Sequence, residues 1–392
     1  MNFELPERLK ALPAYLFVEI DRKKRAAREA GKDVIDFGIG DPDRPTHDFI
    51  LTRMASALRT PANHRYPRGD GAPEFRREVA AFFDRRYQVK LDPDREVLAL
   101  IGSKEGLGHL PLAVVNPGRT VLIPDPAYPV YRAGTLFAGG VPQTMTLAER
   151  NDWLPDLNAI PADVARDAVL MFVNYPNNPT GALGSRDFLE RAVAFCRKHD
   201  IILAQDAAYN EMYFDQPAER RPASVLEVPG AREVAIEFHS LSKTFNMTGW
   251  RLGFAVGNPD VLAALARVKS NVDSGQFTAI QEAGCEAYAG IDRSEIRAAR
   301  RMYQERATLL ADGLRALGFR VRPPAATFYI WAGVPNAYTS MSLASKLLDE
   351  AAVVCIPGTG FGDAGEGYVR FAVTVDVERT QMALERLRRL SW

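Results

Sequence analysis

The segment 239–254 places one lysine, Lys243, among small hydroxyl residues, just after an apolar and β-prone run. A lysine that forms a Schiff base needs such a setting: a partly desolvated site that lowers its pKa, beside groups that hold an anion. Ser240 and Ser242 can donate hydrogen bonds to a phosphate, and Arg251 offers a two-pronged guanidinium fork. The alternative is a solvated lysine after a strand, and the rest of the chain has to decide between the two.

Three further segments place polar residues directly after an apolar run. Gly102-Ser103-Lys104 opens a helical pattern whose first N–H groups could cradle a phosphate, although glycine and serine there also suit a plain turn and helix cap. Tyr128 follows two prolines and could lie flat against an aromatic ring, or else belong to the core. Asn178 could donate to a ligand oxygen, or only form a turn.

Asp206 ends another buried apolar run, and a carboxylate there is costly unless a cation or strong donors meet it. A protonated pyridine nitrogen would satisfy Asp206, and Tyr209 could then reach a phenolic oxygen on the same ring. The alternative is that Asp206 caps the following helix.

The composition excludes several classes of protein. Of the 392 residues, 47% are hydrophobic and 25% charged, as in an ordinary globular enzyme. Basic and acidic residues balance at 49 each, so neither nucleic acid nor a membrane surface is indicated as a partner. Three scattered cysteines and an N-terminus unlike a signal peptide predict a cytoplasmic protein without disulfides. No metal site is expected, because ligand spacing is missing from the histidines His47, His64, His109, His199 and His239.

These residues need a scaffold that brings them together. Apolar runs and helical patterns alternate, which predicts an α/β domain with a largely parallel sheet. In such a sheet ligands bind beyond the carboxyl ends of the strands, where the polar residues lie. Helices are predicted at 16–31, ended by Gly31, and at 184–199. The predicted strands are 97–101, 120–123, 168–173, 201–205, 234–238 and 252–256.

From about residue 285 the pattern changes. A long charged helix at 294–317 precedes short strands near 327–331 and 368–373, which predicts a second, smaller α+β domain. We therefore expect three parts: an N-terminal arm with part of the small domain at 1–45, a large cofactor-binding domain at 46–284, and a C-terminal small domain at 285–392.

Taken together, Asn-Pro-Thr-Gly at 178–181, Asp-x-x-Tyr at 206–209 and Ser-x-Ser-Lys at 240–243 resemble the aspartate aminotransferase-like family of pyridoxal-phosphate enzymes, fold type I. The resemblance spans essentially the whole chain. It implies that Lys243 forms the Schiff base, Asp206 pairs with the pyridine nitrogen, and Tyr209 and Asn178 bond the phenolic oxygen. It also implies that Tyr128 stacks on the ring. The phosphate would be surrounded by Ser103, Lys104, Ser240, Ser242 and Arg251.

The same resemblance adds two residues and a reaction. Tyr66 matches the tyrosine that reaches the phosphate of a neighbouring subunit, which implies a homodimer with shared active sites. Arg370 matches the arginine that grips the substrate α-carboxylate, a task suited to its bidentate geometry. Lys243 would move the α-proton while Asp206 keeps the pyridine ring protonated. The resemblance thus implies a ping-pong transamination between amino acids and 2-oxo acids.

Several segments look particularly like LL-diaminopimelate aminotransferases. This likeness implies transfer from glutamate to tetrahydrodipicolinate in lysine biosynthesis, giving LL-2,6-diaminoheptanedioate and 2-oxoglutarate. It places Tyr15, Gly40 and Lys104 near the substrate, together with Tyr128 and Asn178; Tyr15 could instead merely anchor the arm. The segments are 14–17, 36–43, 102–106, 131–140, 238–250 and 269–275.

Two departures keep the substrate open. Asp70 stands where a glutamate is expected, and Gly275 stands where a polar residue would face the distal end of the substrate. An aminotransferase for aspartate, alanine, aromatic or many amino acids is therefore the alternative. A pyridoxal-phosphate lyase or decarboxylase would keep the same central residues. An aminotransferase-like regulator would need a basic DNA-binding domain, for which the chain has no spare length.

Overall fold

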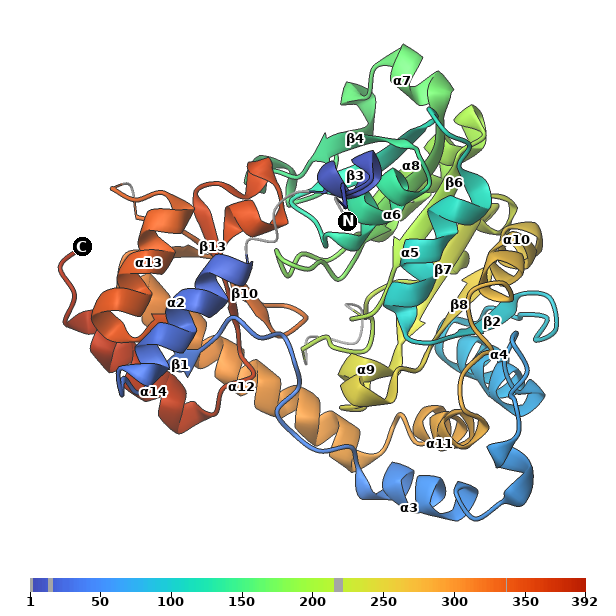
Figure 1. Cartoon of the computed structure of the whole chain (residues 1–392), viewed down its shortest axis with the longest axis horizontal. Coiled ribbons are helices and arrows are strands. Elements are labelled where there is room, and N and C mark those ends of the chain that lie inside the picture. Colours follow the sequence, from blue (N-terminus) through green and yellow to red (C-terminus); the bar gives the residue numbers. More distant parts are fainter. Residues whose placement is uncertain (1–2, 13–16, 215–220, 336) are drawn as a thin grey trace.

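The computed structural model describes residues 3–12, 17–214, 221–335 and 337–392 (Figure 1). Its main element is a seven-stranded sheet, hereafter the large sheet, in the order β2-β8-β7-β6-β5-β3-β4. Six strands run in one direction, and β8 is antiparallel to both of its neighbours. The strands are β2 (Val97–Leu100), β3 (Thr120–Asp125), β4 (Val141–Thr146), β5 (Ala168–Asn174), β6 (Ile202–Asp206), β7 (Ala235–Ser240) and β8 (Gly253–Gly257).

Helices cover both faces of the large sheet, so the residues of its central strands are buried almost throughout. Along β5, Leu170 and Phe172 enter one hydrophobic core while Met171 and Val173 enter another, because successive side chains point to opposite faces. Residues of α5, α6 and α10 line the first core, and residues of α4, α8 and α11 line the second. The helices here are α3 (Asp48–Ala57), α4 (Pro73–Tyr87), α5 (Ser103–Val114), α6 (Val130–Phe137), α7 (Ala162–Asp167), α8 (Arg186–His199), α9 (Leu241–Thr244), α10 (Pro259–Lys269) and α11 (Thr278–Ala289).

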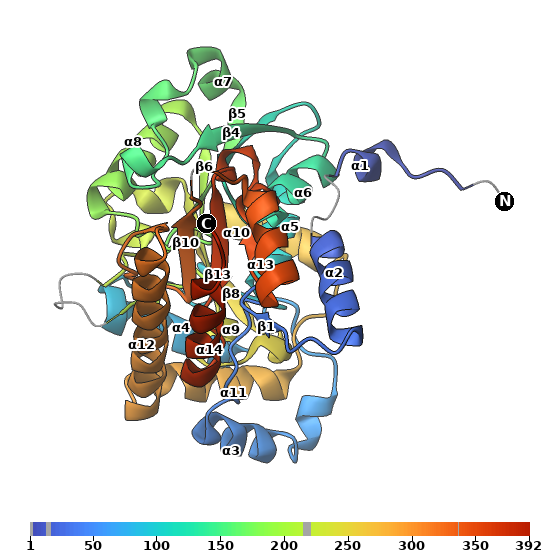
Figure 2. The same ribbon diagram turned by 90° about the vertical axis from the view of Figure 1, so that its left-hand side faces the viewer.

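The C-terminal part is built on a four-stranded antiparallel sheet, hereafter the small sheet, in the order β12-β13-β10-β9. A separate parallel pair, β1 with β11, joins the N-terminal segment to this part. Helices α12, α14, α13 and α2 form a row in which each contacts the next (Figure 2). The elements are α1 (Glu7–Lys10), α2 (Phe17–Glu29), β1 (Ile35–Asp36), α12 (Ser294–Ala316), β9 (Arg320–Val321), β10 (Tyr329–Gly333), α13 (Ser340–Ala351), β11 (Val353–Val354), β12 (Ile356–Pro357), β13 (Tyr368–Ala372) and α14 (Val377–Arg388).

The predicted α/β fold with a mostly parallel sheet is confirmed. All six strands predicted for the large sheet are present, and β4 is a seventh that the sequence pattern missed. It lies at the edge of the sheet, contains Pro142 and has polar residues at Gln143, Thr144 and Thr146, so no continuous apolar run marks it. The domain boundaries stay predictions. None of the described helices has the length and apolar character needed to cross a membrane.

Candidate active site

The topology of the large sheet explains why distant residues meet. Asn174, Asp206 and Ser240 are the last residues of β5, β6 and β7, three adjacent parallel strands, so they share one edge of the sheet. Ser103 follows β2 closely and opens α5. Because β8 runs the opposite way, Arg251, two residues before its start, reaches the same edge.

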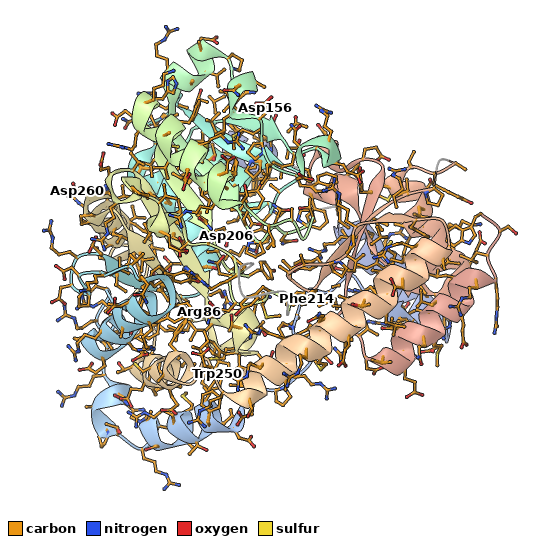
Figure 3. The ribbon with its side chains drawn as sticks, turned by 180° about the vertical axis from the view of Figure 1, so that it is seen from behind. Arg86, Asp156, Asp206, Phe214, Trp250 and Asp260 are labelled. Carbon is orange, nitrogen blue, oxygen red and sulfur yellow. The ribbon has the colours of Figure 1, made fainter. Side chains whose placement is uncertain are left out.

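A cavity of about 690 Å³ lies between this edge and the small sheet. Asp206 lies near the middle of the molecule, where the two parts face each other (Figure 3). Tyr66 does not line the cavity; its side chain is 89% exposed on the single chain. Tyr15 lies outside the described residues. The sequence-predicted residues that line the cavity are Gly40, Ser103, Lys104, Tyr128, Asn178, Asp206, Tyr209, Ser240, Ser242, Lys243, Arg251 and Arg370.

Lys243 lies in the short helix α9, directly after β7. Its Nζ donates to the backbone oxygen of Gly40 over 3.0 Å and faces no carboxylate at ion-pair distance in the described part of the chain. Burial lowers the pKa of Lys243 to about 8, and the charges of Arg251 and Arg370 act in the same direction, against that of Asp41. The amine is therefore neutral in a useful fraction near neutral pH, which a nucleophile or base requires.

Asp206 is buried and accepts a 2.7 Å hydrogen bond from the Tyr131 hydroxyl. Burial raises the pKa of Asp206 above its ordinary value, while the hydrogen bond from Tyr131 acts the other way. No lysine or arginine among the described residues pairs with this carboxylate. A buried acid that faces a cavity without a cation fits a protonated pyridine nitrogen.

Arg370 is a buried cation without an ionic partner in the described chain. Its Nη1 donates to Asn178 Oδ1 over 2.8 Å and its Nη2 to the Gly38 oxygen over 3.0 Å, while Nε has no hydrogen-bond partner. Burial lowers the pKa of Arg370, but a guanidinium stays charged at any ordinary pH. Neutral partners and an unpaired charge at a cavity wall fit a ligand carboxylate.

The start of α5 and the loop before β8 form a cradle that fits a phosphate. The N-cap of α5 is Gly102, so no side chain caps the first turn, and its N–H groups carry the positive end of the helix dipole. Gly102 has φ +77°, and a Cβ there would collide with the guanidinium of Arg251. A Cβ on Gly253 would come within 2.7 Å of the Ser103 nitrogen. Backbone atoms therefore leave no room for a side chain at Gly253, and the positive φ of Gly102 disfavours one at that position.

Sequence reasoning missed several residues of this site. Tyr131 stacks on Phe172 with ring centroids 4.9 Å apart, as a core residue would, although its position three residues after Tyr128 was a usable signal. Tyr329 lies within hydrogen-bonding distance of Tyr209 and had no signal in the sequence. Further residues at the cavity wall without a predicted role include Leu12, Gly38, Phe137, Asn174, Thr248 and Phe361.

The two departures noted in the sequence lie against each other. Gly275 has φ +87°, and a Cβ there would come within 2.7 Å of the backbone oxygen of Arg68. Asp70 in the same loop accepts from Arg68 and forms an ion pair with Arg76. A local packing constraint therefore accounts for the glycine at 275. Neither segment lines the cavity of this chain.

Comparison with known proteins agrees with this arrangement. The family model described as "Aminotransferase class I and II" matches residues 32–387. The LL-diaminopimelate aminotransferase of Syntrophobacter fumaroxidans is 55% identical over 392 residues, which cover both chains completely. The apo-BacF structure from Bacillus subtilis has a TM-score of 0.94 at 36% identity, over 100% of this chain and 99% of that one. A double mutant of Thermus thermophilus aspartate aminotransferase has a TM-score of 0.92 at 30% identity, over 99% of this chain and 100% of that one.

Proposed function

We propose that this chain, which belongs to the class I and II aminotransferases, transfers the amino group of glutamate to tetrahydrodipicolinate. The products would be LL-2,6-diaminoheptanedioate and 2-oxoglutarate. As a member of its family the chain is a pyridoxal-phosphate-dependent transaminase. The main support for this substrate is the 55% identity, over the full length of both chains, to a curated LL-diaminopimelate aminotransferase.

In this proposal different residues of the cavity bind different parts of the cofactor. The N-terminus of α5, Ser240, Ser242 and Arg251 would hold the phosphate, and Tyr128 would lie against the ring. When bound, pyridoxal phosphate supplies an aldehyde for amine exchange and a ring that withdraws electrons. The collision that any side chain at Gly102 would produce supports a cradle shaped for close approach.

Three residues of the chain would bind or donate the protons that the reaction requires. With a pKa of about 8, Lys243 can attack as a neutral amine and later carry the substrate's α-proton on Nζ. Asp206, buried without a cation, would hold a proton on the pyridine nitrogen of the bound cofactor. Burial raises the pKa of Tyr209 well above its usual value, so its hydroxyl remains a donor across the working pH range.

Arg370 and Asn178 orient the substrate. The guanidinium of Arg370 would take the α-carboxylate, and the 2.8 Å bond to Asn178 Oδ1 fixes the direction in which it points. Binding a carboxylate also gives a partner to the buried charge, which is otherwise costly. This charge pairing would fix the α-carbon above Lys243, so that positioning contributes to the rate.

We also propose a cytoplasmic homodimer in which Tyr66 reaches the phosphate site of the partner subunit. Tyr66 is 89% exposed and does not line the cavity of its own chain, and both observations support this role. The three cysteines Cys196, Cys285 and Cys355 are free, which suits a reducing compartment.

A coupled assay tests the proposed substrate. Purified holoenzyme receives LL-diaminopimelate and 2-oxoglutarate, and the glutamate formed is measured, with meso-diaminopimelate, aspartate, alanine and an aromatic amino acid as parallel donors. We expect a strong preference for the LL isomer. Turnover of the other donors alone would keep the transaminase chemistry and refute the lysine-pathway assignment. Pyruvate and ammonia as products would instead indicate a lyase.

A further inference from the structure

Tyr329 lies in β10 at the junction of the small sheet and the cavity, and the function described so far leaves it without a role. It is 5% exposed and lines the cavity from the side opposite the large sheet. Its neighbours are two of the residues on which the proposed function depends, Tyr209 and Arg370, together with Gly40 of the N-terminal segment.

The hydroxyl and the ring of Tyr329 contact different residues of the proposed site. The hydroxyl lies 2.9 Å from the Tyr209 hydroxyl, and the ring centroid lies 4.2 Å from Arg370 Cζ. The third contact is steric: a Cβ on Gly40 would collide with the Tyr329 hydroxyl. The Gly40 oxygen accepts a hydrogen bond from Lys243. Tyr329 therefore contacts Tyr209 and Arg370 directly and packs against the residue that binds Lys243.

We propose that Tyr329 is a positioning residue that holds the Tyr209 hydroxyl and the Arg370 guanidinium in a fixed relation to each other. The inference rests on the proposed roles of Tyr209 and Arg370. When Tyr209 donates its proton to the phenolic oxygen of the cofactor, the Tyr329 hydroxyl donates to the oxygen of Tyr209. Hydrogen bonds in such a chain polarise and strengthen one another. The ring meanwhile restricts the guanidinium through a buried cation–π contact.

The test uses the holoenzyme and four variants. Tyr329→Phe removes only the hydroxyl, and Tyr329→Leu also removes the ring. Tyr209→Phe is the positive control. Tyr368→Phe is the matched control. Tyr368 lies on β13, the strand that pairs with β10, and it does not line the cavity. Its hydroxyl donates a 2.8 Å hydrogen bond to Glu149. The measurements are the pH midpoint of the lysine-dependent absorbance band and the dissociation constant of glutarate, a dicarboxylate without an amino group.

Tyr329→Phe should raise the pH midpoint by roughly half a unit, in the same direction as Tyr209→Phe but by less. The reason is that a weaker hydrogen bond leaves more negative charge on the phenolic oxygen, which holds the neighbouring proton more tightly. Glutarate affinity should stay within about twofold in Tyr329→Phe and fall roughly threefold to tenfold in Tyr329→Leu. Tyr368→Phe should change neither value.

The possible results distinguish a failure of the inference about Tyr329 from a failure of the proposed function. An unchanged midpoint in Tyr329→Phe, with a clear shift in Tyr209→Phe, overturns the inference and leaves the proposed function intact. A shift in neither variant removes the role of Tyr209 and the inference with it. An equal shift in Tyr368→Phe would show a general effect of losing a tyrosine hydroxyl, which also overturns it. Unchanged glutarate binding in Tyr329→Leu overturns the part that concerns Arg370.

Discussion

At the scale of single residues, the site depends on charged groups that have hydrogen-bond partners but no ionic partner in the described chain. Lys243, Asp206 and Arg370 line one cavity, and none of them forms an ion pair within the described chain. Such an arrangement reduces stability in the absence of ligand, because each buried charge loses its hydration. It also leaves each charge free for a group that only a ligand brings.

The lowered pKa of Lys243 predicts how the apoprotein takes up its cofactor. Only the neutral amine attacks an aldehyde, and burial has moved the pKa from 10.5 down to about 8. The rate of cofactor attachment should therefore rise about tenfold per pH unit below pH 8 and level off above it. Stopped-flow absorbance measures this from about pH 6.5 upward, clear of the phosphate's second pKa near 6. A rate that keeps rising to pH 10 contradicts the assignment, and Lys243→Ala should give no attachment.

Asp206→Asn should separate activity from stability. We expect kcat to fall by roughly 10²–10³-fold, because the variant no longer holds the proton on the pyridine nitrogen. The apoprotein should melt at or above the wild-type temperature, because a buried carboxylate without a cation has been removed. Steady-state kinetics and calorimetry of the apoprotein check the two halves. A lowered melting temperature with normal kcat would show that Asp206 is structural.

The sequence predicts the position of a polar residue well where that residue ends a parallel strand. Asp206 and Ser240 end parallel strands, so an apolar run followed by a polar residue was enough to locate them. Tyr131 and Tyr329 lie within α6 and β10, where a tyrosine is ordinary core material. Their roles depend on packing between elements far apart in the sequence, which no local pattern records.

At the scale of elements, the contact between α5 and the start of β8 predicts a strict need for glycine at position 102. Gly102→Ala strains a backbone with φ +77° and displaces Arg251. Cofactor affinity of the apoprotein should fall at least about tenfold, which corresponds to about 1.4 kcal/mol. Gly249→Ala is the control, because Gly249 is exposed and a Cβ there meets nothing within 4 Å. Equal affinities in both variants would exclude the proposed cradle.

The elements themselves show what periodicity can and cannot predict. Strands β5, β6 and β7 could be predicted because all three are buried and begin with apolar residues, although β6 contains Gln205 and β7 contains Glu237. The reversed direction of β8 could not be predicted from its composition, since an apolar strand reads alike in either direction. Yet that reversal is what brings Arg251 to the cavity.

At the scale of the whole molecule, mixing subunits tests the shared site. If Tyr66 serves the partner, a hybrid of a Lys243→Ala subunit with a Tyr66→Phe subunit contains one site with both residues intact. We expect each hybrid dimer to bind cofactor at that site with wild-type affinity, although both parent dimers bind poorly. If Tyr66 served its own chain, no hybrid site would be intact and mixing would restore nothing. Light scattering checks that the parents are dimers.

The N-terminal segment completes the site from the far end of the chain. The Gly38 oxygen accepts from Arg370, a partner 332 residues away, and β1 pairs with β11. During synthesis the first forty residues therefore leave the ribosome long before their partners exist. The proposed carboxylate site is complete only after β13 has been synthesised, because that strand contains Arg370. We expect a growing polypeptide that has not yet reached β13 to bind no carboxylate at this site, because Arg370 lies on that strand.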